Sequence, residues 1–277
     1  MTELSSLVTP IFDIARIAGE AILTIYEQDF KTTTKIDGSP VTEADLASHD
    51  ILVRALEELL PGVPVLSEES EDIPFKDRSK WSIYWLIDPL DGTKEFLKRS
   101  NEFTVNVALI EANRPILGLV YTPVLNRFHW GFQNGGAWRT QNGKQRRIRT
   151  LEYEGGPACI AASRSHGQRR LAGYLKSFQL TEGDCDLQLM GSAVKICMVA
   201  DGSSHLYPRF GPTGEWDTAA ADIILHEAGG QILQHNMQKL EYNKRSLINP
   251  SFFACCSGTY DWSALLKNDL LTAHKIE

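Results

Sequence analysis

Hydrophobic residues follow helical and then strand-like spacing through the first half of the chain. From Leu7 to Ile25 they recur every three or four positions, which predicts an amphipathic helix. A second helix is predicted from Thr42 to Leu60, where Pro61 and Gly62 end it. Apolar runs of strand length follow, and the later ones predict an antiparallel meander that continues through the Asn142-Gly143 turn. These runs cover residues 63–66, 83–87, 103–110, 116–121 and 128–132.

From about residue 155 the pattern changes to short strands that alternate with helices. Strands are predicted at residues 158–162, 187–190, 205–207, 231–233 and 252–255, and helices at 168–178, 193–200 and 218–228. A helix pair and a meander followed by alternating elements indicate a layered α/β architecture. We expect two lobes, residues 1–154 and 155–277, that together form one domain.

Composition and charge favour a soluble enzyme. The 277 residues are 43% hydrophobic, and 28 Lys and Arg stand against 35 Asp and Glu, a net charge of −7. This balance argues against general binding to nucleic acid or to an anionic membrane, although a metal ion could still recruit a phosphorylated substrate. We expect no signal peptide and no membrane span. Five cysteines without Cys-x-x-Cys spacing predict free thiols and a cytoplasmic location.

Carboxylates follow two of the apolar runs and precede one predicted helix. Glu68 follows the first run, Asp88 and Asp91 follow the run at residues 83–87, and Asp217 precedes the helix. Carboxylates at the ends of buried strands are costly unless they are paired or bind a metal. Since only oxygen ligands are offered, we expect hard ions, Mg²⁺ or Mn²⁺, rather than zinc.

The residues beside these carboxylates complete a plausible phosphate site. Pro89 would stiffen a turn that directs Asp88 and Asp91 into one site, and the Leu90 carbonyl is a further oxygen ligand. Backbone N–H groups at Gly92 and Thr93 could receive a phosphate. The Thr93 hydroxyl could orient a water molecule.

Each acidic segment taken alone has a simpler interpretation. Asp217 could be a helix N-cap, and Asp45, three residues after Thr42, could close a capping box. Residues 68–72 could be a solvated acidic loop. The segment from Asp88 to Thr93 is less easily explained as a surface turn, because it directly follows an apolar run that predicts a buried strand. Together the segments favour a metal site.

These segments resemble those of the inositol monophosphatase superfamily of Mg²⁺-dependent, lithium-sensitive phosphatases, over nearly the whole chain. The matching motifs are Asp88-Pro89-Leu90-Asp91-Gly92-Thr93, Trp216-Asp217-Thr218-Ala219-Ala220, Pro40-Val41-Thr42-Glu43-Ala44-Asp45 and Leu66-Ser67-Glu68-Glu69. The resemblance implies the family's αβαβα sandwich of two lobes. It also implies two or three Mg²⁺ ions, with Mn²⁺ as an alternative, held by Glu68, Asp88, the Leu90 carbonyl, Asp91 and Asp217.

The same resemblance implies catalytic roles. Thr93, supported by Asp45 and together with Glu68, would orient the attacking water, and the amides of Gly92 and Thr93 would hold the phosphate. The expected substrate contacts are Glu68, Leu90, Asp91, Gly92, Thr93, Ser192, Lys195 and Asp217.

Within the superfamily the chain is most similar to the bacterial CysQ-type 3′(2′),5′-bisphosphate nucleotidases. The similar segments are residues 91–96, 102–106, 163–166, 191–195 and 207–213, and inositol phosphatases usually have Thr-Asn in place of Lys94-Glu95. This implies removal of the 3′-phosphate from adenosine 3′,5′-bisphosphate, giving AMP and phosphate in sulfur assimilation, with 3′-phosphoadenylyl sulfate as a second candidate substrate. Peripheral attachment to the inner membrane and a monomeric or homodimeric state remain open.

The second phosphate and the adenine need cationic and stacking groups outside the metal site. Lys195, Arg164 and Arg209 are the basic residues nearest the similar segments, and Lys195 follows Ser192 closely enough to face the same pocket. Arg164 could equally be a surface charge, and His166 is better explained as a surface-loop histidine.

Two other functions remain as alternatives. One is an inositol or sugar phosphatase of the same superfamily, and the other is a catalytically silent regulatory or RNA-binding relative. The complete acidic set argues against the silent relative, because a buried charge cluster is costly without metal. The basic run from Lys144 to Arg149 favours a solvated edge strand over a nucleic-acid patch.

Overall fold

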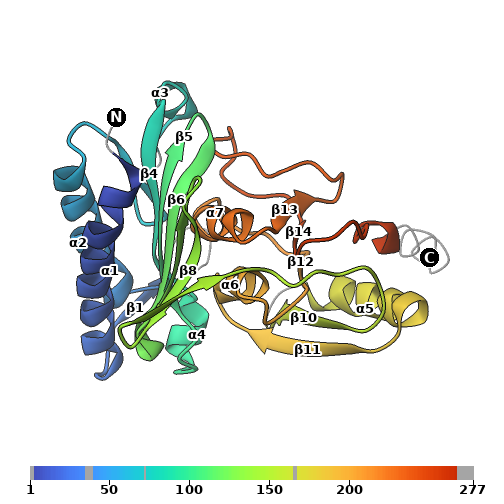
Figure 1. Cartoon of the computed structure of the whole chain (residues 1–277). Coiled ribbons are helices and arrows are strands. Elements are labelled where there is room, and N and C mark those ends of the chain that lie inside the picture. Colours follow the sequence, from blue (N-terminus) through green and yellow to red (C-terminus); the bar gives the residue numbers. More distant parts are fainter. Residues whose placement is uncertain (1–2, 35–39, 72, 165–166, 267–277) are drawn as a thin grey trace.

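The computed structural model describes residues 3–34, 40–71, 73–164 and 167–266, and its larger sheet has seven strands (Figure 1). Their order is β3-β4-β5-β6-β7-β8-β9, and every neighbouring pair is antiparallel except β3 and β4. The predicted meander is confirmed, because each hairpin joins consecutive strands. The strands are β3 (Val65–Ser67), β4 (Ile83–Asp91), β5 (Thr104–Glu111), β6 (Arg114–Thr122), β7 (Arg127–Phe132), β8 (Gly136–Gln141) and β9 (Lys144–Ile148).

Two long helices cover one face of this sheet, α1 (Leu4–Tyr26) and α2 (Glu43–Leu59) (Figure 1). The buried residues of α1 lie three or four positions apart, so that Leu7, Ile11 and Ile22 share one face. They pack into one core with Trp85 and other side chains of the sheet. Burial of each large apolar side chain contributes about 1.5–3 kcal/mol. Both helices lie where the apolar spacing predicts them.

The opposite face carries α6 (Val194–Ala200) and α7 (Ala219–Glu227), which separate the large sheet from a second sheet (Figure 1). The second sheet has five strands in the order β11-β10-β12-β14-β13. Helix α5 (Gln168–Glu182) lies on its outer side. The layers therefore run helix–sheet–helix–sheet–helix, which confirms the expected αβαβα sandwich. The strands are β10 (Ala158–Ser163), β11 (Cys185–Met190), β12 (Leu206–Arg209), β13 (Gln231–Gln234) and β14 (Phe252–Cys255).

Several short elements do not follow from the sequence pattern. They are β1 (Thr32–Thr34), β2 (Pro40–Thr42), α3 (Phe75–Arg78), α4 (Thr93–Leu97) and the 3₁₀ helices η1 (Pro123–Leu125) and η2 (Ala264–Leu266). Elements of three to five residues are too short for a hydrophobic period to be visible. Of these, α4 matters most, because it begins at the candidate phosphate site.

The segment from Asp88 to Asp91, expected as a turn after the apolar run at residues 83–87, continues the strand instead. It belongs to β4, and the register with β5 shifts between these two aspartates. Pro89 has no N–H to donate, so a regular ladder cannot continue through it. The irregular strand end keeps both aspartates on one rigid element.

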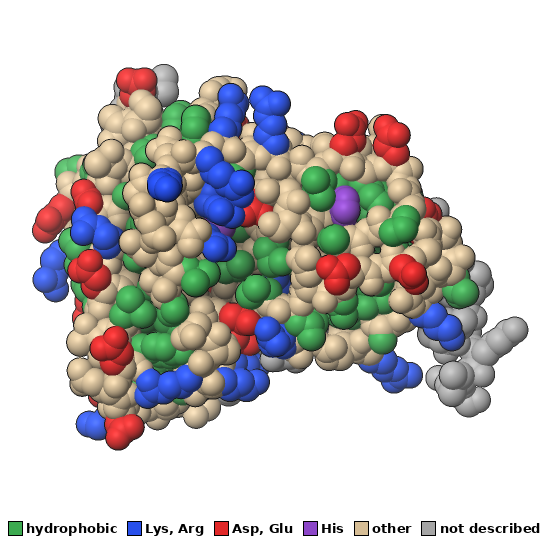
Figure 2. All heavy atoms as spheres, turned by 60° about the horizontal axis from the view of Figure 1, so that its bottom comes forward, with side chains coloured by type: hydrophobic (Ala, Val, Ile, Leu, Met, Phe, Trp, Pro, Cys, Tyr) green, Lys and Arg blue, Asp and Glu red, His purple; other side chains and the backbone are tan. Residues whose placement is uncertain are grey.

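Strand β9 forms one edge of the large sheet, and four of its five residues are exposed. The predicted solvated edge strand is therefore confirmed, and its charges disfavour pairing with another edge. Figure 2 shows side chains of both charge signs spread over the face that it presents, with Lys and Arg in several places. Within the described residues, no helix is long and apolar enough to cross a membrane.

Candidate active site

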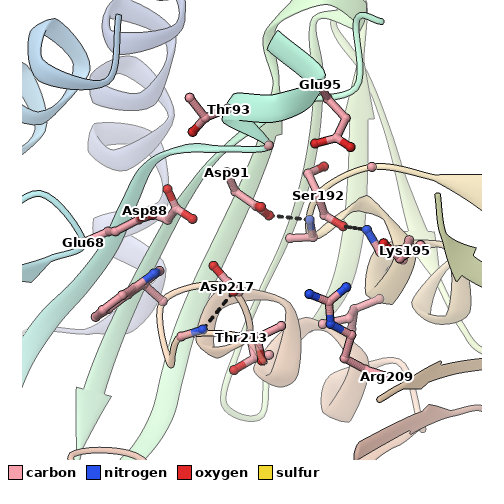
Figure 3. Close-up of a pocket in the computed structure, with 18 of the residues that line it drawn as sticks. Glu68, Asp88, Asp91, Thr93, Glu95, Ser192, Lys195, Arg209, Thr213 and Asp217 are labelled. Carbon is pink, nitrogen blue, oxygen red and sulfur yellow. Dashed lines mark hydrogen bonds between the residues drawn. The ribbon is translucent and has the colours of Figure 1, made fainter. Parts of the chain in front are cut away.

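A cavity of about 370 Å³ lies where β4, α4, α6, β12 and the start of α7 meet (Figure 3). Glu68, Asp88 and Asp217 form its acidic end. Ser192, Lys195 and Arg209 line the opposite, basic end, with Asp91 between the two ends. Segments far apart in the sequence thus supply one site.

The acidic end brings together three of the predicted metal ligands. One carboxylate oxygen each of Glu68, Asp88 and Asp217 lies within 4.8 Å of the others. Asp88 is 1% exposed, and its Oδ1 accepts a hydrogen bond from the Leu90 amide at 3.1 Å. Its buried Oδ2 has no hydrogen-bond partner in the described part of the chain. An acceptor of this kind can be satisfied by a cation or by a hydrogen-bond donor such as water.

Burial and neighbouring negative charge act together on these carboxylates. Burial raises the pKa of Asp88 well above its usual value, and the charges of Glu68 and Asp91 raise it further. Burial likewise raises the pKa of Asp217 to about 8, with Asp91 and Glu68 adding to the effect. Such a group of like charges is unfavourable without a counter-ion. Three carboxylates, with no nitrogen or sulfur donor in the group, suit a hard cation, so the residues fit a metal ion.

Asp91 faces the middle of the cavity rather than this acidic group. Its Oδ2 accepts hydrogen bonds from the Ala193 amide at 2.5 Å and from Asn106 Nδ2 at 3.3 Å. Burial raises the pKa of Asp91, while Lys195 and the Ala193 amide lower it. Asp91 therefore links β4 to the segment that begins α6 (Figure 3). Asn106 and the Ala193 amide were not identified from the sequence.

Asp45 satisfies both of its alternative interpretations. Its Oδ2 accepts hydrogen bonds from the backbone N–H and the hydroxyl of Thr42 at 2.7 and 2.6 Å, which closes the capping box of α2. Its Oδ1 accepts from the Thr93 hydroxyl at 3.1 Å. A cap on α2 thus also orients a hydroxyl at the start of α4.

Gly92 forms the sharp turn from β4 into α4. Its φ of +102° lies in the left-handed region that favours glycine. A Cβ atom at this position would lie 3.0 Å from the Glu102 carbonyl oxygen. The turn places Thr93 at the rim of the acidic end (Figure 3).

The N-cap interpretation of Asp217 is wrong. The N-cap residue of α7 is Thr218, which makes no side-chain capping bond, and Asp217 Oδ2 accepts from the Gly214 amide at 2.9 Å. That bond stabilises the loop before α7 and leaves the carboxylate beside Glu68 and Asp88. The nearby Glu215, to which the sequence assigns no role, is fully buried and forms an ion pair of 2.5 Å with Lys244.

Lys195 and Arg209 are buried cations held by backbone oxygens. Lys195 Nζ donates to the Ser192 carbonyl at 2.6 Å and lies 5.3 Å from the centre of the Tyr207 ring. Burial lowers the pKa of Lys195 to about 8, although Asp91 counteracts this effect. Arg209 donates to the carbonyls of Gly211 and Pro212 at 3.2 and 2.9 Å.

The other basic candidates are placed differently. Arg164 does not line the cavity, because its half-exposed guanidinium forms an ion pair of 2.7 Å with Glu102. This contact favours the surface-charge interpretation, in which Arg164 supports a loop at the cavity rim. His166 lies outside the described residues. Glu95, Tyr207, Trp216 and Phe252 also line the cavity and were missed. Glu95, Tyr207 and Trp216 lie in segments that carry the family resemblance, but none of them was assigned a role, and Phe252 has no such signal.

The site and the five-layer fold define a class of protein. The model of the inositol monophosphatase family matches residues 3–269, and the chain therefore belongs to this family of metal-dependent phosphatases. The inositol monophosphatase of Anabaena (Nostoc) sp. PCC 7120 has the same fold, with a TM-score of 0.75 and 21% identity over 97% of each chain.

More similar relatives share one name, 3′(2′),5′-bisphosphate nucleotidase CysQ. The protein of Escherichia coli K12 is 43% identical over 246 residues, which cover 87% of this chain and 96% of the relative. That of Haemophilus influenzae is 35% identical and covers 94% of this chain and 97% of the relative. The CysQ structure from Bacteroides thetaiotaomicron aligns with a TM-score of 0.81 and 36% identity, covering 91% of this chain and 97% of that one.

Proposed function

We propose that this chain is a Mg²⁺-dependent phosphatase that removes the 3′-phosphate of adenosine 3′,5′-bisphosphate to give AMP and phosphate. The observation that carries the proposal is one cavity with an acidic, metal-type end and a second end with two buried cations, Lys195 and Arg209. A substrate with two phosphates matches this division of charge. The similarity to 3′(2′),5′-bisphosphate nucleotidases supports the same substrate.

The proposed ligands are Glu68, Asp88 and Asp217, with Asp91 and the Leu90 carbonyl completing the set for two or three Mg²⁺ or Mn²⁺ ions. When bound, these ions would acidify the attacking water and offset the charge of the phosphate. The unsatisfied Asp88 Oδ2 supports this assignment, since a cation would satisfy such a buried acceptor.

The chain's own residues would position the water and the phosphate. The Thr93 hydroxyl donates its proton to Asp45 Oδ1, so that its lone pairs can accept a hydrogen bond from the attacking water. Glu68 would share this water from the acidic end. The amides of Gly92 and Thr93 would hold the transferred phosphate at the turn into α4.

The basic end would bind the rest of the nucleotide. Lys195 and Arg209 would neutralise the 5′-phosphate, and Ser192 lies beside them at the start of the segment that leads into α6. We include 3′-phosphoadenylyl sulfate as a substrate, because it carries the same 3′-phosphate. The five free thiols support our proposal of a reducing, cytoplasmic compartment.

The test is phosphate release by the purified protein with Mg²⁺. Adenosine 3′,5′-bisphosphate, inositol 1-phosphate and fructose 1,6-bisphosphate would be compared, each with and without Li⁺. We expect preference for the nucleotide and inhibition by Li⁺. Preference for inositol or sugar phosphate would overturn the substrate assignment and keep the metal site. No hydrolysis of any substrate would favour the silent relative.

A further inference from the structure

Glu95 is a carboxylate at the cavity that the metal site does not use. We propose that it accepts a hydrogen bond from the ribose hydroxyl beside the scissile phosphate, and so makes the enzyme selective for ribonucleotides. This inference rests on the proposed function. It adds a specificity-determining residue for the sugar, which the relatives' names do not address.

The fold places Glu95 close to the reacting phosphate but apart from the metal ligands. It lies on α4 two residues after Thr93, and its side chain lines the cavity. Figure 3 shows it above Ser192, on the side of Asp91 away from Asp88. Within the described residues, the carboxylates that could share an ion are Glu68, Asp88 and Asp217, without Glu95.

The loop beneath Glu95 holds it in this position. A Cβ atom on Gly191 would lie 2.8 Å from Glu95 Cγ, so the absence of a side chain there lets α4 pack closely on the loop before α6. The Gly191 amide donates to Glu102 Oε2 at 2.8 Å, and Glu102 also pairs with Arg164. This loop is therefore tied to the start of β5, which limits the movement of the Glu95 side chain.

The chemistry of Glu95 selects the kind of group that it can meet. An ionised carboxylate can only accept hydrogen bonds, and it repels a phosphate. In the described part of the chain, the Glu95 carboxylate accepts no hydrogen bond, and its negative charge raises the pKa values of Lys195 and Arg164. A bound nucleotide can therefore present a donor to it. The hydroxyl on the carbon next to the scissile ester is the donor nearest the phosphate that Thr93 contacts.

A ribose diol also explains how one acceptor can serve two isomers. The 2′ and 3′ oxygens are neighbours on the same face of the ring. When the 3′-phosphate is cleaved the free hydroxyl is at 2′, and when the 2′-phosphate is cleaved it is at 3′. Glu95 can accept from either hydroxyl without a change in the site.

The experiment compares adenosine 3′,5′-bisphosphate with its 2′-deoxy analogue. The wild-type protein should prefer the ribonucleotide by about 10- to 100-fold in kcat/KM, the effect of one hydrogen bond to a charged group. Glu95→Ala should reduce this ratio to near one by lowering the ribonucleotide rate alone. Glu95→Gln, whose amide oxygen still accepts, should retain part of it. Glu111→Gln, an exposed carboxylate at the far end of β5, is the matched control and should leave the ratio unchanged.

The ratio separates this role from a structural or electrostatic one. Loss of the fold, or a changed charge on Lys195, would lower both rates together, and that result would overturn the inference. A ratio near one in the wild-type protein, or an unchanged ratio in Glu95→Ala, would also overturn it while leaving the proposed function intact. If the wild-type protein hydrolyses inositol 1-phosphate but not the nucleotide, the proposed function and this inference both fail.

Discussion

The two ends of the cavity differ in the sign of their buried charges and in the partners that those charges have within the protein. At the acidic end, Glu68, Asp88 and Asp217 lie within 4.8 Å of one another, and burial and like charge raise the pKa values of the two aspartates. At the basic end, Lys195 and Arg209 each donate to backbone carbonyls. The acidic end gathers like charges that suit a cation, whereas the basic end has its acceptors within the fold.

A third buried cluster, around Asp201, contains a carboxylate whose interaction partners belong to the protein itself. Asp201 lies 3.1 Å from Arg139 and 3.5 Å from His129, and its side chain is 5% exposed. Burial raises its pKa, but contacts with His129, Ser203 and Arg139 outweigh this effect and lower the pKa of Asp201 to about 2. Asp201 is therefore a structural anion, whereas Asp88 Oδ2 has no hydrogen-bond partner in the described part of the chain.

The largest effect is expected for Asp88→Asn. Turnover should fall at least about 1000-fold, because an orienting charge of the metal site is lost. Without Mg²⁺ the variant should be more stable than the wild-type protein by about 1 kcal/mol, since one of several like charges is removed. Phosphate release measures the turnover, and thermal unfolding with Mg²⁺ and with EDTA measures the stability. Near-normal turnover would contradict the assignment of the acidic end.

Thr93→Ala should lower kcat about 100-fold or more, because it removes the hydroxyl that donates to Asp45 and that we propose orients the attacking water. Thr93→Ser keeps the hydroxyl and should restore most of the rate. Steady-state kinetics with adenosine 3′,5′-bisphosphate compare kcat of the two variants with that of the wild-type protein. If serine and alanine are equally impaired, the methyl group and not the hydroxyl is what the site uses.

Lys195→Ala tests the basic end. The preference for adenosine 3′,5′-bisphosphate over 3′-AMP should fall about 10- to 100-fold, since a charge-assisted contact to the second phosphate is lost. The rate with 3′-AMP, which has no second phosphate, is the internal control and should change little. A preserved preference would remove Lys195 from the substrate site.

Asp201→Asn should change stability and not activity. The pKa of Asp201 is lowered to about 2, below the ordinary value of about 4 that it has when unfolded, so its stabilisation is present above pH 4 and is lost as the pH falls toward 2. The substitution should lower the free energy of unfolding by about 2 kcal/mol at pH 7 and flatten its dependence on pH below 4. Urea denaturation between pH 2 and 7 measures this. An equal pH dependence in both proteins would show that Asp201 is not the group responsible.

Much of the acidic end could be predicted from local sequence. Asp88 and Asp91 directly follow a hydrophobic run of strand length, which is unusual for aspartates in a surface turn. Glu68 likewise follows an apolar run, and Asp217 directly precedes a predicted helix. Local context was less decisive for single residues. Asp45 proved to be both a helix cap and a partner of Thr93, and Asp217 was not a cap at all.

The basic end was harder to predict, because its residues come from elements that meet only after folding. Lys195 could be identified because it lies close to Ser192 in the sequence. Arg164, however, forms an ion pair with Glu102 at the rim of the cavity. Glu95 enters the cavity because α4 packs on Gly191, almost 100 residues further along the chain. Neither contact has a periodic or compositional signal.

The sequence by itself determined the layered fold, the long helices, the meander and the four carboxylates, because hydrophobic period and costly buried charge are local properties. Only the tertiary structure decided which carboxylates come together, which cations line the cavity, and where Glu95 points. Those outcomes depend on how β4, α4, α6 and α7 pack against one another. Packing sets distances and burial, and these in turn set the electrostatics of the site.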